Sequence, residues 1–190
     1  MKPLYFLLII FAFIANLSYS QADKKFAQDT LIWSGGNLLT KEDFKGRKSS
    51  KKMAASTCSG LFIHSKDKDG TLMFYVEAIF YKSKSFFMKE NSPYILKHEQ
   101  LHFDITELFA RKLRQKIVQR DFKKTSNVRD AIQKMFDKAF QDCEREQSKY
   151  DTDTEHGINA AKQEVWAEKI KQQLLELDPY SSTEIDVANQ

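Results

Sequence analysis

Residues 92–105 read SPYILKHEQLHFDI, and this stretch decides how the rest of the chain is interpreted. Ser92 is a preferred residue just before a helix, and Pro93 is common at the first helical position. Apolar residues then recur at helical spacing, at Leu101, Ile105, Leu108 and Ile117. Such spacing is typical of one apolar face of a helix. The sequence therefore predicts a long amphipathic helix that begins after Ser92.

Within this helix, His98, Glu99 and His102 form an HExxH motif. Residues four apart lie one above the other on a helix, so both histidines can bind one metal ion. Zinc is the usual metal for such a motif, with three protein ligands and one position open to water. Glu99 lies about 100° around the helix from His98 and can reach that water. The motif thus predicts a Zn²⁺ site with Glu99 as the catalytic base.

The pattern before and after this helix predicts the rest of the fold. Three segments rich in residues that favour strands precede it, and they are 31–34, 54–64 and 71–81. Asp69-Gly70 predicts a hairpin turn between the last two. Apolar stripes predict two more helices, one from Asn127 to about Gln147 and one that starts near residue 158. We expect an α+β, zincin-like domain over residues 21–178, with a small antiparallel sheet followed by three helices.

The two ends of the chain carry different expectations. Residues 1–20 have the parts of a secretory signal peptide, with Lys2, an apolar run over residues 4–15, and the small residues Ser18 and Ser20. This run is shorter than the roughly 20 residues that span a bilayer. We therefore expect cleavage before Gln21, a secreted or periplasmic protein, and no stable membrane anchor. Residues 179–190 are expected to form a polar, disordered tail.

The charge of the chain excludes few functions. The sequence has 30 Lys and Arg residues against 26 Asp and Glu residues, a net charge of +4. Cleavage of the signal peptide would remove Lys2 and leave +3. So mild a balance does not predict a nucleic-acid partner, and we expect none. A basic run over residues 45–52 is expected to be a solvated loop, with contact to anionic envelope material as the alternative.

Two histidines hold zinc weakly, so the sequence must supply a third ligand. Residues 150–157 are dense in side chains that can bind a metal, and we favour His156 because it lies where a loop enters a helix. A glutamate on the following helix, Glu164 or Glu168, is the rival, since zinc sites of the His₂Glu type are common. Asp151 is a third option. Tyr150 could polarise a substrate carbonyl or simply pack in the core.

The cysteines, Cys58 and Cys143, also leave two interpretations open. An oxidising compartment permits a disulfide between them, which would stabilise the chain by about 4–5 kcal/mol. Two separate buried thiols are the alternative, because sequence cannot show whether the two residues approach each other.

Several groups of residues together resemble one known family. They are the run HEQLHFDI at 98–105 with Glu107, Ala110-Arg111 and Leu113-Arg114, then Tyr150-Asp151, Thr154, His156-Gly157, Gln163 and Trp166, and the early Trp33-Ser34, Leu39-Thr40 and Asp43-Phe44-Lys45-Gly46. They span most of the chain after residue 20 and resemble an uncharacterised family of secreted bacterial proteins that is described as zinc-dependent proteases. Leu101 departs from the glycine expected in that pattern, and Ser85-Phe86 departs from the expected Ser-Trp.

The resemblance implies a zincin-like peptidase that acts on a protein or peptide. We therefore expect a hydrolase that cleaves peptide bonds through a zinc-activated water. Two alternatives remain, a non-catalytic zinc-binding envelope protein with a relic site, and a zinc amidase that acts on cell-wall peptide.

Overall fold

The computed structural model describes residues 21–47, 54–88 and 93–187, which form a mixed α/β fold with a small antiparallel sheet and four α-helices. The predicted signal peptide, the predicted cap Ser92 and residues 48–52 of the basic run lie outside the described residues. The strands are β1 (Thr30–Ile32), β2 (Ala55–Ser56), β3 (Ser59–Lys68), β4 (Thr71–Tyr81), β5 (Phe86–Phe87) and β6 (Glu184–Asp186). The helices are α1 (Gln21–Asp29), α2 (Pro93–Val118), α3 (Val128–Thr154) and α4 (Ala160–Glu176).

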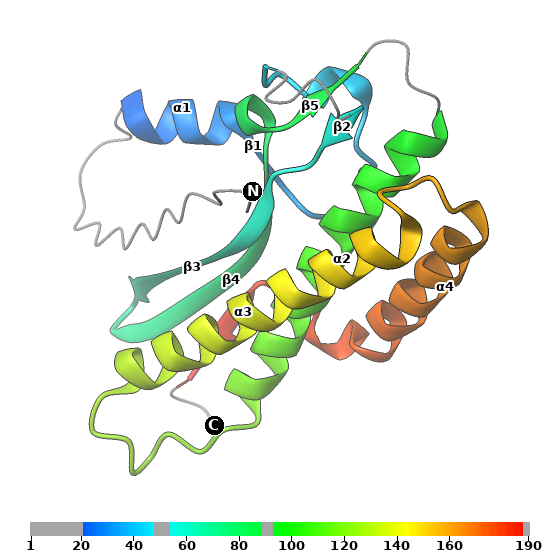
Figure 1. Cartoon of the computed structure of the whole chain (residues 1–190). Coiled ribbons are helices and arrows are strands. Elements are labelled where there is room, and N and C mark those ends of the chain that lie inside the picture. Colours follow the sequence, from blue (N-terminus) through cyan, green and yellow to red (C-terminus); the bar gives the residue numbers. More distant parts are fainter. Residues whose placement is uncertain (1–20, 48–53, 89–92, 188–190) are drawn as a thin grey trace.

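The sheet is built around β4 (Figure 1), whose bounds match the strand that the sequence predicted for residues 71–81. β3 pairs with β4 along ten residues on one edge, and β1 and β6 share the other edge. The predicted strand 54–64 is instead divided, because β2 leaves the main sheet and pairs with β5. The predicted hairpin turn is confirmed. Asp69 and Gly70 have φ values of 55° and 81°, and the Gly70 N–H donates to Asp67 Oδ1 at 3.0 Å.

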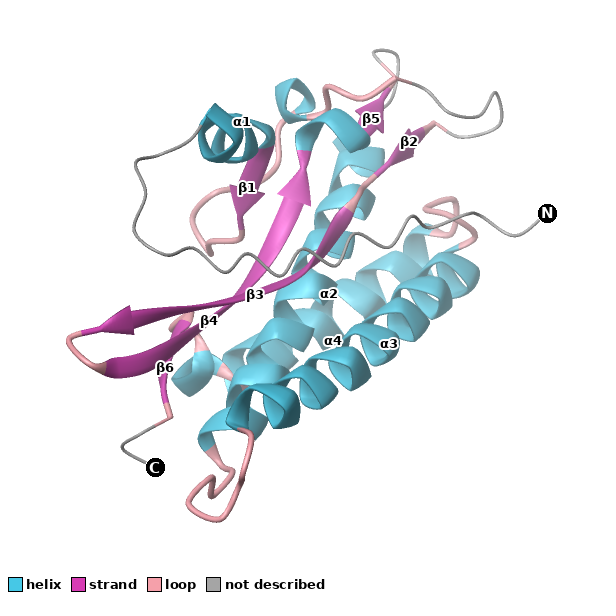
Figure 2. Cartoon of the chain, turned by 90° about the vertical axis from the view of Figure 1, so that its left-hand side faces the viewer, coloured by secondary structure: helices cyan, strands magenta, loops and turns pink. Residues whose placement is uncertain are grey.

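The helix with the HExxH motif packs its apolar face on the sheet. Figure 2 shows α2, α3 and α4 together on one side of β3 and β4. Val76 and Phe80 of β4 are fully buried, as are Ile105 and Leu108 of α2. The rings of Phe80 and Phe103 lie 5.7 Å apart, centre to centre. This contact joins strand and helix in one core and fixes the position of the face of α2 that carries the HExxH motif.

Two hydrogen-bonded links tie the start of the chain to the same helix. The Trp33 indole N–H donates to Asp104 Oδ1 at 2.8 Å. The Leu39 backbone N–H donates to Gln100 Oε1 at 2.7 Å, and the Gln100 amide donates to Asp104. Because Gln100 and Asp104 lie one helical turn apart, these bonds hold α2 against the loop that follows β1.

The helix count and the helix bounds differ from the prediction. Residues 21–29, to which the sequence analysis assigned no helix or strand, form α1, so four helices rather than three are described. α3 begins at the predicted cap, where Asn127 accepts a hydrogen bond from the Asp130 N–H. It continues past Gln147 to Thr154, because polar side chains extend its buried stripe. This extension moves Asp151 from a predicted loop onto a helix.

The prediction of a disordered tail from residue 179 is wrong for the described residues. Residues 184–186 form β6 beside β4, and Ile185 is buried. Arg114 explains how this segment is held, because its guanidinium donates to the carbonyls of Tyr180 and Ser181 at 2.8 and 2.7 Å. The same guanidinium donates to both Glu107 carboxylate oxygens at 2.8 Å. The domain therefore extends beyond residue 178.

Two further properties of the chain follow from the described residues. Cys58 and Cys143 are both free thiols, the first half-buried and the second buried. None of the described helices combines the length and the apolar character that crossing a membrane requires.

Candidate metal centre

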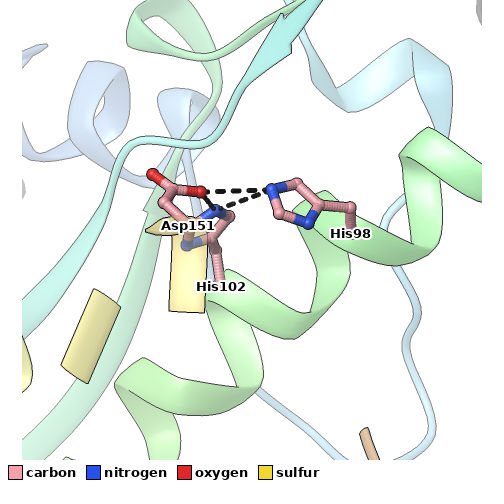
Figure 3. A group of neighbouring side chains, drawn as sticks. All are labelled: His98, His102 and Asp151. Atoms are coloured by element: carbon pink, nitrogen blue, oxygen red, sulfur yellow. Dashed lines mark hydrogen bonds and ion pairs between the residues drawn. The ribbon is translucent and has the colours of Figure 1, made fainter. Parts of the chain in front are cut away.

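Three side chains that could hold a metal ion meet between α2 and α3. His98 and His102 come from α2, and Asp151 comes from the last turn of α3 (Figure 3). The two Nε2 atoms lie 3.2 Å apart, and Asp151 Oδ1 lies 3.2 Å from His98 Nε2 and 3.0 Å from His102 Nε2. Among the described residues, this trio is a group whose ligand atoms all lie close enough to hold one metal ion. His98 is buried, whereas His102 and Asp151 are partly accessible.

The end of α3 is built to bring its carboxylate here. Gln147, Tyr150, Asp151 and Thr154 recur at spacings of three and four and face α2. Tyr150 is fully buried, its ring stacks on His98 at 4.7 Å, and its hydroxyl donates to the His98 carbonyl at 3.4 Å. Tyr150 therefore packs the two helices together, and this contact places Asp151 beside the histidine pair.

Two glutamines orient the imidazoles. His102 Nδ1 lies 2.5 Å from Gln147 Oε1, and His98 Nδ1 lies 3.2 Å from Gln163 Oε1 of α4. The amide orientation is set because Gln147 Nε2 donates to the His102 carbonyl and Gln163 Nε2 donates to the Tyr94 carbonyl. An amide oxygen only accepts hydrogen bonds, so each Nδ1 must carry the proton. In the neutral ring, each Nε2 then presents a lone pair toward Asp151.

This arrangement places three electron-rich atoms at one point. Without a cation, two imidazole lone pairs and a carboxylate oxygen repel one another at 3.0–3.2 Å. A proton on His102 relieves part of this repulsion. Burial lowers the pKa of His102, but the carboxylate of Asp151 outweighs it and raises that pKa. The lone pair of His98 still faces both partners, whereas one metal ion satisfies all three atoms.

The size of the triangle fits zinc. Zinc bonds of 2.0–2.1 Å at tetrahedral angles separate neighbouring ligand atoms by roughly 3.3–3.4 Å. The observed separations of 3.0–3.2 Å are slightly shorter. Three protein ligands leave one tetrahedral position for water or substrate, the arrangement of catalytic rather than structural zinc sites. The residues present therefore fit Zn²⁺ with an open position.

Glu99 follows the first histidine and is not a member of the ligand group. Its side chain is 4% exposed, and its Oε2 atom is buried without a hydrogen-bond partner in the described structure. A buried carboxylate oxygen with no partner is unfavourable by a few kcal/mol. The position is therefore suited to a group that receives its hydrogen bond from a bound water or substrate.

The loop after α3 makes room for His98. Glu155, His156 and Gly157 have φ values of 53°, 55° and 83°, so three successive residues adopt the left-handed conformation. A Cβ on Gly157 would lie 3.0 Å from His98 Cγ and 3.2 Å from its Nδ1. Only glycine both adopts this φ without strain and leaves space for the imidazole. The backbone of this loop thus packs against the metal-binding face.

His156, the predicted third ligand, is not brought into the cluster. The left-handed turn directs its side chain outward, where it is 76% exposed, and its Nδ1 lies 3.6 Å from the second oxygen of Asp151. Asp151, which the sequence left as an alternative, occupies the third position. The rival residues Glu164 and Glu168 are exposed on α4. The sequence analysis ended this helix near Gln147, so it did not place Asp151 on the same helix face as Gln147 and Tyr150.

The sequence analysis also gave no role to Gln147 and Gln163. Each is a polar residue on the inner face of a helix, and Gln163 is 3% exposed. A glutamine on an otherwise apolar helix face could have indicated a buried hydrogen bond, but the sequence pattern does not show which residue that glutamine contacts.

Comparison with known proteins adds a family without a function. A model of the family described as "Bacterial protein of unknown function (DUF922)" matches residues 88–157, less than half of the chain, and this segment includes α2, α3 and the three residues of the cluster. No curated protein matches the chain, and no solved structure matches it. The matched segment runs from just before α2 to Gly157, so it contains the whole candidate site.

Proposed function

We propose that this protein is a zinc-dependent metallopeptidase, with His98, His102 and Asp151 as ligands and Glu99 as the general base. The observation that carries the proposal is the convergence of two imidazole Nε2 atoms, oriented by Gln147 and Gln163, on one oxygen of Asp151. A zinc ion with these three protein ligands would keep a fourth position for water or substrate, which supports a metal that takes part in a reaction.

The chemistry divides between the metal and the chain. A bound zinc ion would polarise the carbonyl of the scissile peptide bond and lower the pKa of a water beside it. Glu99 would accept the proton of that water at its unpartnered Oε2 and deliver it to the leaving amine. Tyr150 and the two glutamines would keep the imidazoles in place while charge develops. The expected overall reaction consumes one water and yields a carboxylate and an amine.

Two other functions compete with this proposal. A non-catalytic zinc-binding envelope protein would need a closed coordination shell, and the three-residue cluster does not favour it. A zinc amidase that acts on cell-wall peptide would use the same groups, so only substrates separate it from a protease. We also propose that residues 1–20 direct export, which would place the reaction outside the cytoplasm.

The substitution Glu99→Gln tests the catalytic role. Purified residues 21–190 and their E99Q variant would be loaded with zinc and incubated with a fluorescence-quenched peptide library, and separately with cell-wall peptide. We expect both proteins to hold about one zinc per chain, and hydrolysis to fall by about 10²-fold or more in E99Q. Full hydrolysis by zinc-loaded E99Q would overturn the role of Glu99. Zinc binding without hydrolysis of either substrate class by the wild type would favour the non-catalytic function.

A further inference from the structure

A cationic groove runs along the helices below the metal centre. Two hollows of about 820 and about 530 Å³ lie between α2 and α3, and Lys116 and Lys138 line both of them. The hollows therefore adjoin, and we call them together the α2–α3 groove. The larger one has an apolar floor that includes the buried residues Leu113 and Ala139.

The basic residues of the groove stand in two rows. One row follows α2 and the residues just beyond it, with Lys112, Lys116 and Arg120 four residues apart. The other follows α3, with Lys134, Lys138, Arg145 and Lys149. At 1.5 Å per residue, a step of four residues is about 6 Å, and the row on α3 spans about 22 Å. Steps of four residues recur in both rows, with one step of seven between Lys138 and Arg145, so the groove offers cations over an extended length.

The acidic residues of the groove balance its cations only in part. Four acidic residues line it against seven basic ones, so three positive charges remain in excess. Three of the four have partners, and Lys138 and Arg145 among these partners belong to the groove itself. Asp142 contacts Lys138 and Arg145, Glu146 contacts Lys169 of α4 at 2.6 Å, and Asp130 contacts Asn127 at 2.7 Å. The fourth is Glu144.

Among the described residues, four groove lysines have no carboxylate within ion-pair distance, and they are Lys112, Lys116, Lys134 and Lys149. Lys112 is also half-buried. Burial, together with the nearby charges of Lys169 and Lys116, lowers its pKa despite the opposing effect of Glu146. Cations held together in this way are stabilised when an anion binds between them.

We propose that the α2–α3 groove binds a linear phosphodiester polymer. The length of the two rows favours a chain of anions over a single small ion. All seven cations can bind phosphate, the five lysines as compact point charges and the two arginines through two parallel N–H groups. The apolar floor would accommodate the uncharged units between the phosphates. This site is separate from the metal centre and does not depend on the proposed peptidase activity.

The test compares two triple variants with the same change in net charge. The groove variant K116Q/K134Q/K138Q removes three exposed cations, and the control K25Q/K162Q/K171Q removes three exposed lysines on α1 and α4. Glutamine keeps helix propensity close to that of lysine. Circular dichroism and zinc content would confirm that both variants retain the fold. The probe is a fluorescent oligomer of phosphodiester-linked propanediol, which carries phosphates without bases, with polyglutamate as competitor.

We expect the groove variant to bind the oligomer about tenfold or more weakly than the wild type. The slope of log affinity against log salt should also fall by about 2, because three phosphate contacts are lost. The control should bind within about twofold of the wild type. Three results would overturn the proposal: no binding by the wild type, equal losses in both variants, or equally tight binding of polyglutamate.

Discussion

The substitution Gly157→Ala should disturb the metal centre through one added methyl group. Gly157 has φ +83°, and the new Cβ would lie 3.0 Å from His98 Cγ and 3.3 Å from its Cβ. At 3.0 Å, one of the two groups must move by a few tenths of an ångström. His98 is buried between Gly157, Tyr150 and Gln163, so it has little room to move. We therefore expect its imidazole to tilt away from Gln163.

The loss of folding stability in Gly157→Ala has two contributions, one from the backbone and one from the contact with His98. A side chain in the left-handed conformation destabilises the folded chain by about 1–2 kcal/mol. The contact with His98 should add about 1–3 kcal/mol, the usual range for overpacking a buried site. Zinc affinity should fall by about 10- to 100-fold, the usual loss when the groups that orient a ligand are disturbed.

Gly70→Ala is the matched control. Gly70 has φ +81°, yet a Cβ there would meet nothing within 4 Å. Gly70→Ala therefore has the same cost of a left-handed backbone without a contact like that between residue 157 and His98. Chemical unfolding and zinc titration of both variants separate the two contributions. If the two variants are destabilised equally and both keep wild-type zinc affinity, the packing of Gly157 against His98 does not support the metal site.

Three more predictions follow from the described contacts. Gln147→Leu removes the acceptor for the His102 N–H and should weaken zinc binding by about 10- to 100-fold, as measured by competition with a chelator. Gln147→Glu keeps an acceptor and should lose less zinc affinity. Native protein should show at most one thiol that reacts with a disulfide reagent, Cys58, because burial raises the pKa of Cys143 to about 12. Denatured, unreduced protein should show two reactive thiols, and none would reveal a disulfide. Burial raises the pKa of Asp43, but hydrogen bonds from a neighbouring threonine and lysine outweigh it and lower the pKa below 3.8. Its ionised form therefore stabilises the fold above about pH 4, and this contribution disappears as the pH falls further. Asp43→Asn should be less stable than the wild type by less than about 1 kcal/mol near pH 6 and equally stable near pH 2, as measured by urea unfolding.

The local signals in the sequence predicted the metal helix and the central hairpin. The spacing of His98 and His102 fixes their relation once a helix forms, and Asp69-Gly70 fixes a two-residue turn. Both depend on contacts between residues close in sequence. The predicted start of α3 at Asn127 was correct for the same reason, since the Asn127 side chain accepts a hydrogen bond from the N–H of Asp130, three residues ahead.

The third ligand could not be found in this way, because it depends on how two helices pack. The buried stripe at the end of α3 consists of Gln147, Tyr150 and Thr154, and hydrophobic periodicity does not register such residues. Recognising them as one face would have placed Asp151 on the helix. The β6 pairing was missed for a related reason. This short segment is held by hydrogen bonds from Arg114 to the carbonyls just before it and by its pairing with β4, and both contacts are distant in sequence.

Zinc per chain in the wild type, Asp151→Ala and His156→Ala is the most direct test of the central claim, that α3 supplies the third ligand. The three proteins, each spanning residues 21–190, would be measured by elemental analysis after loading and dialysis, with the fold checked by circular dichroism. The structure predicts about one zinc in the wild type and in His156→Ala, and a large loss in Asp151→Ala. Loss in His156→Ala with retention in Asp151→Ala, or no zinc in the wild type, would contradict it.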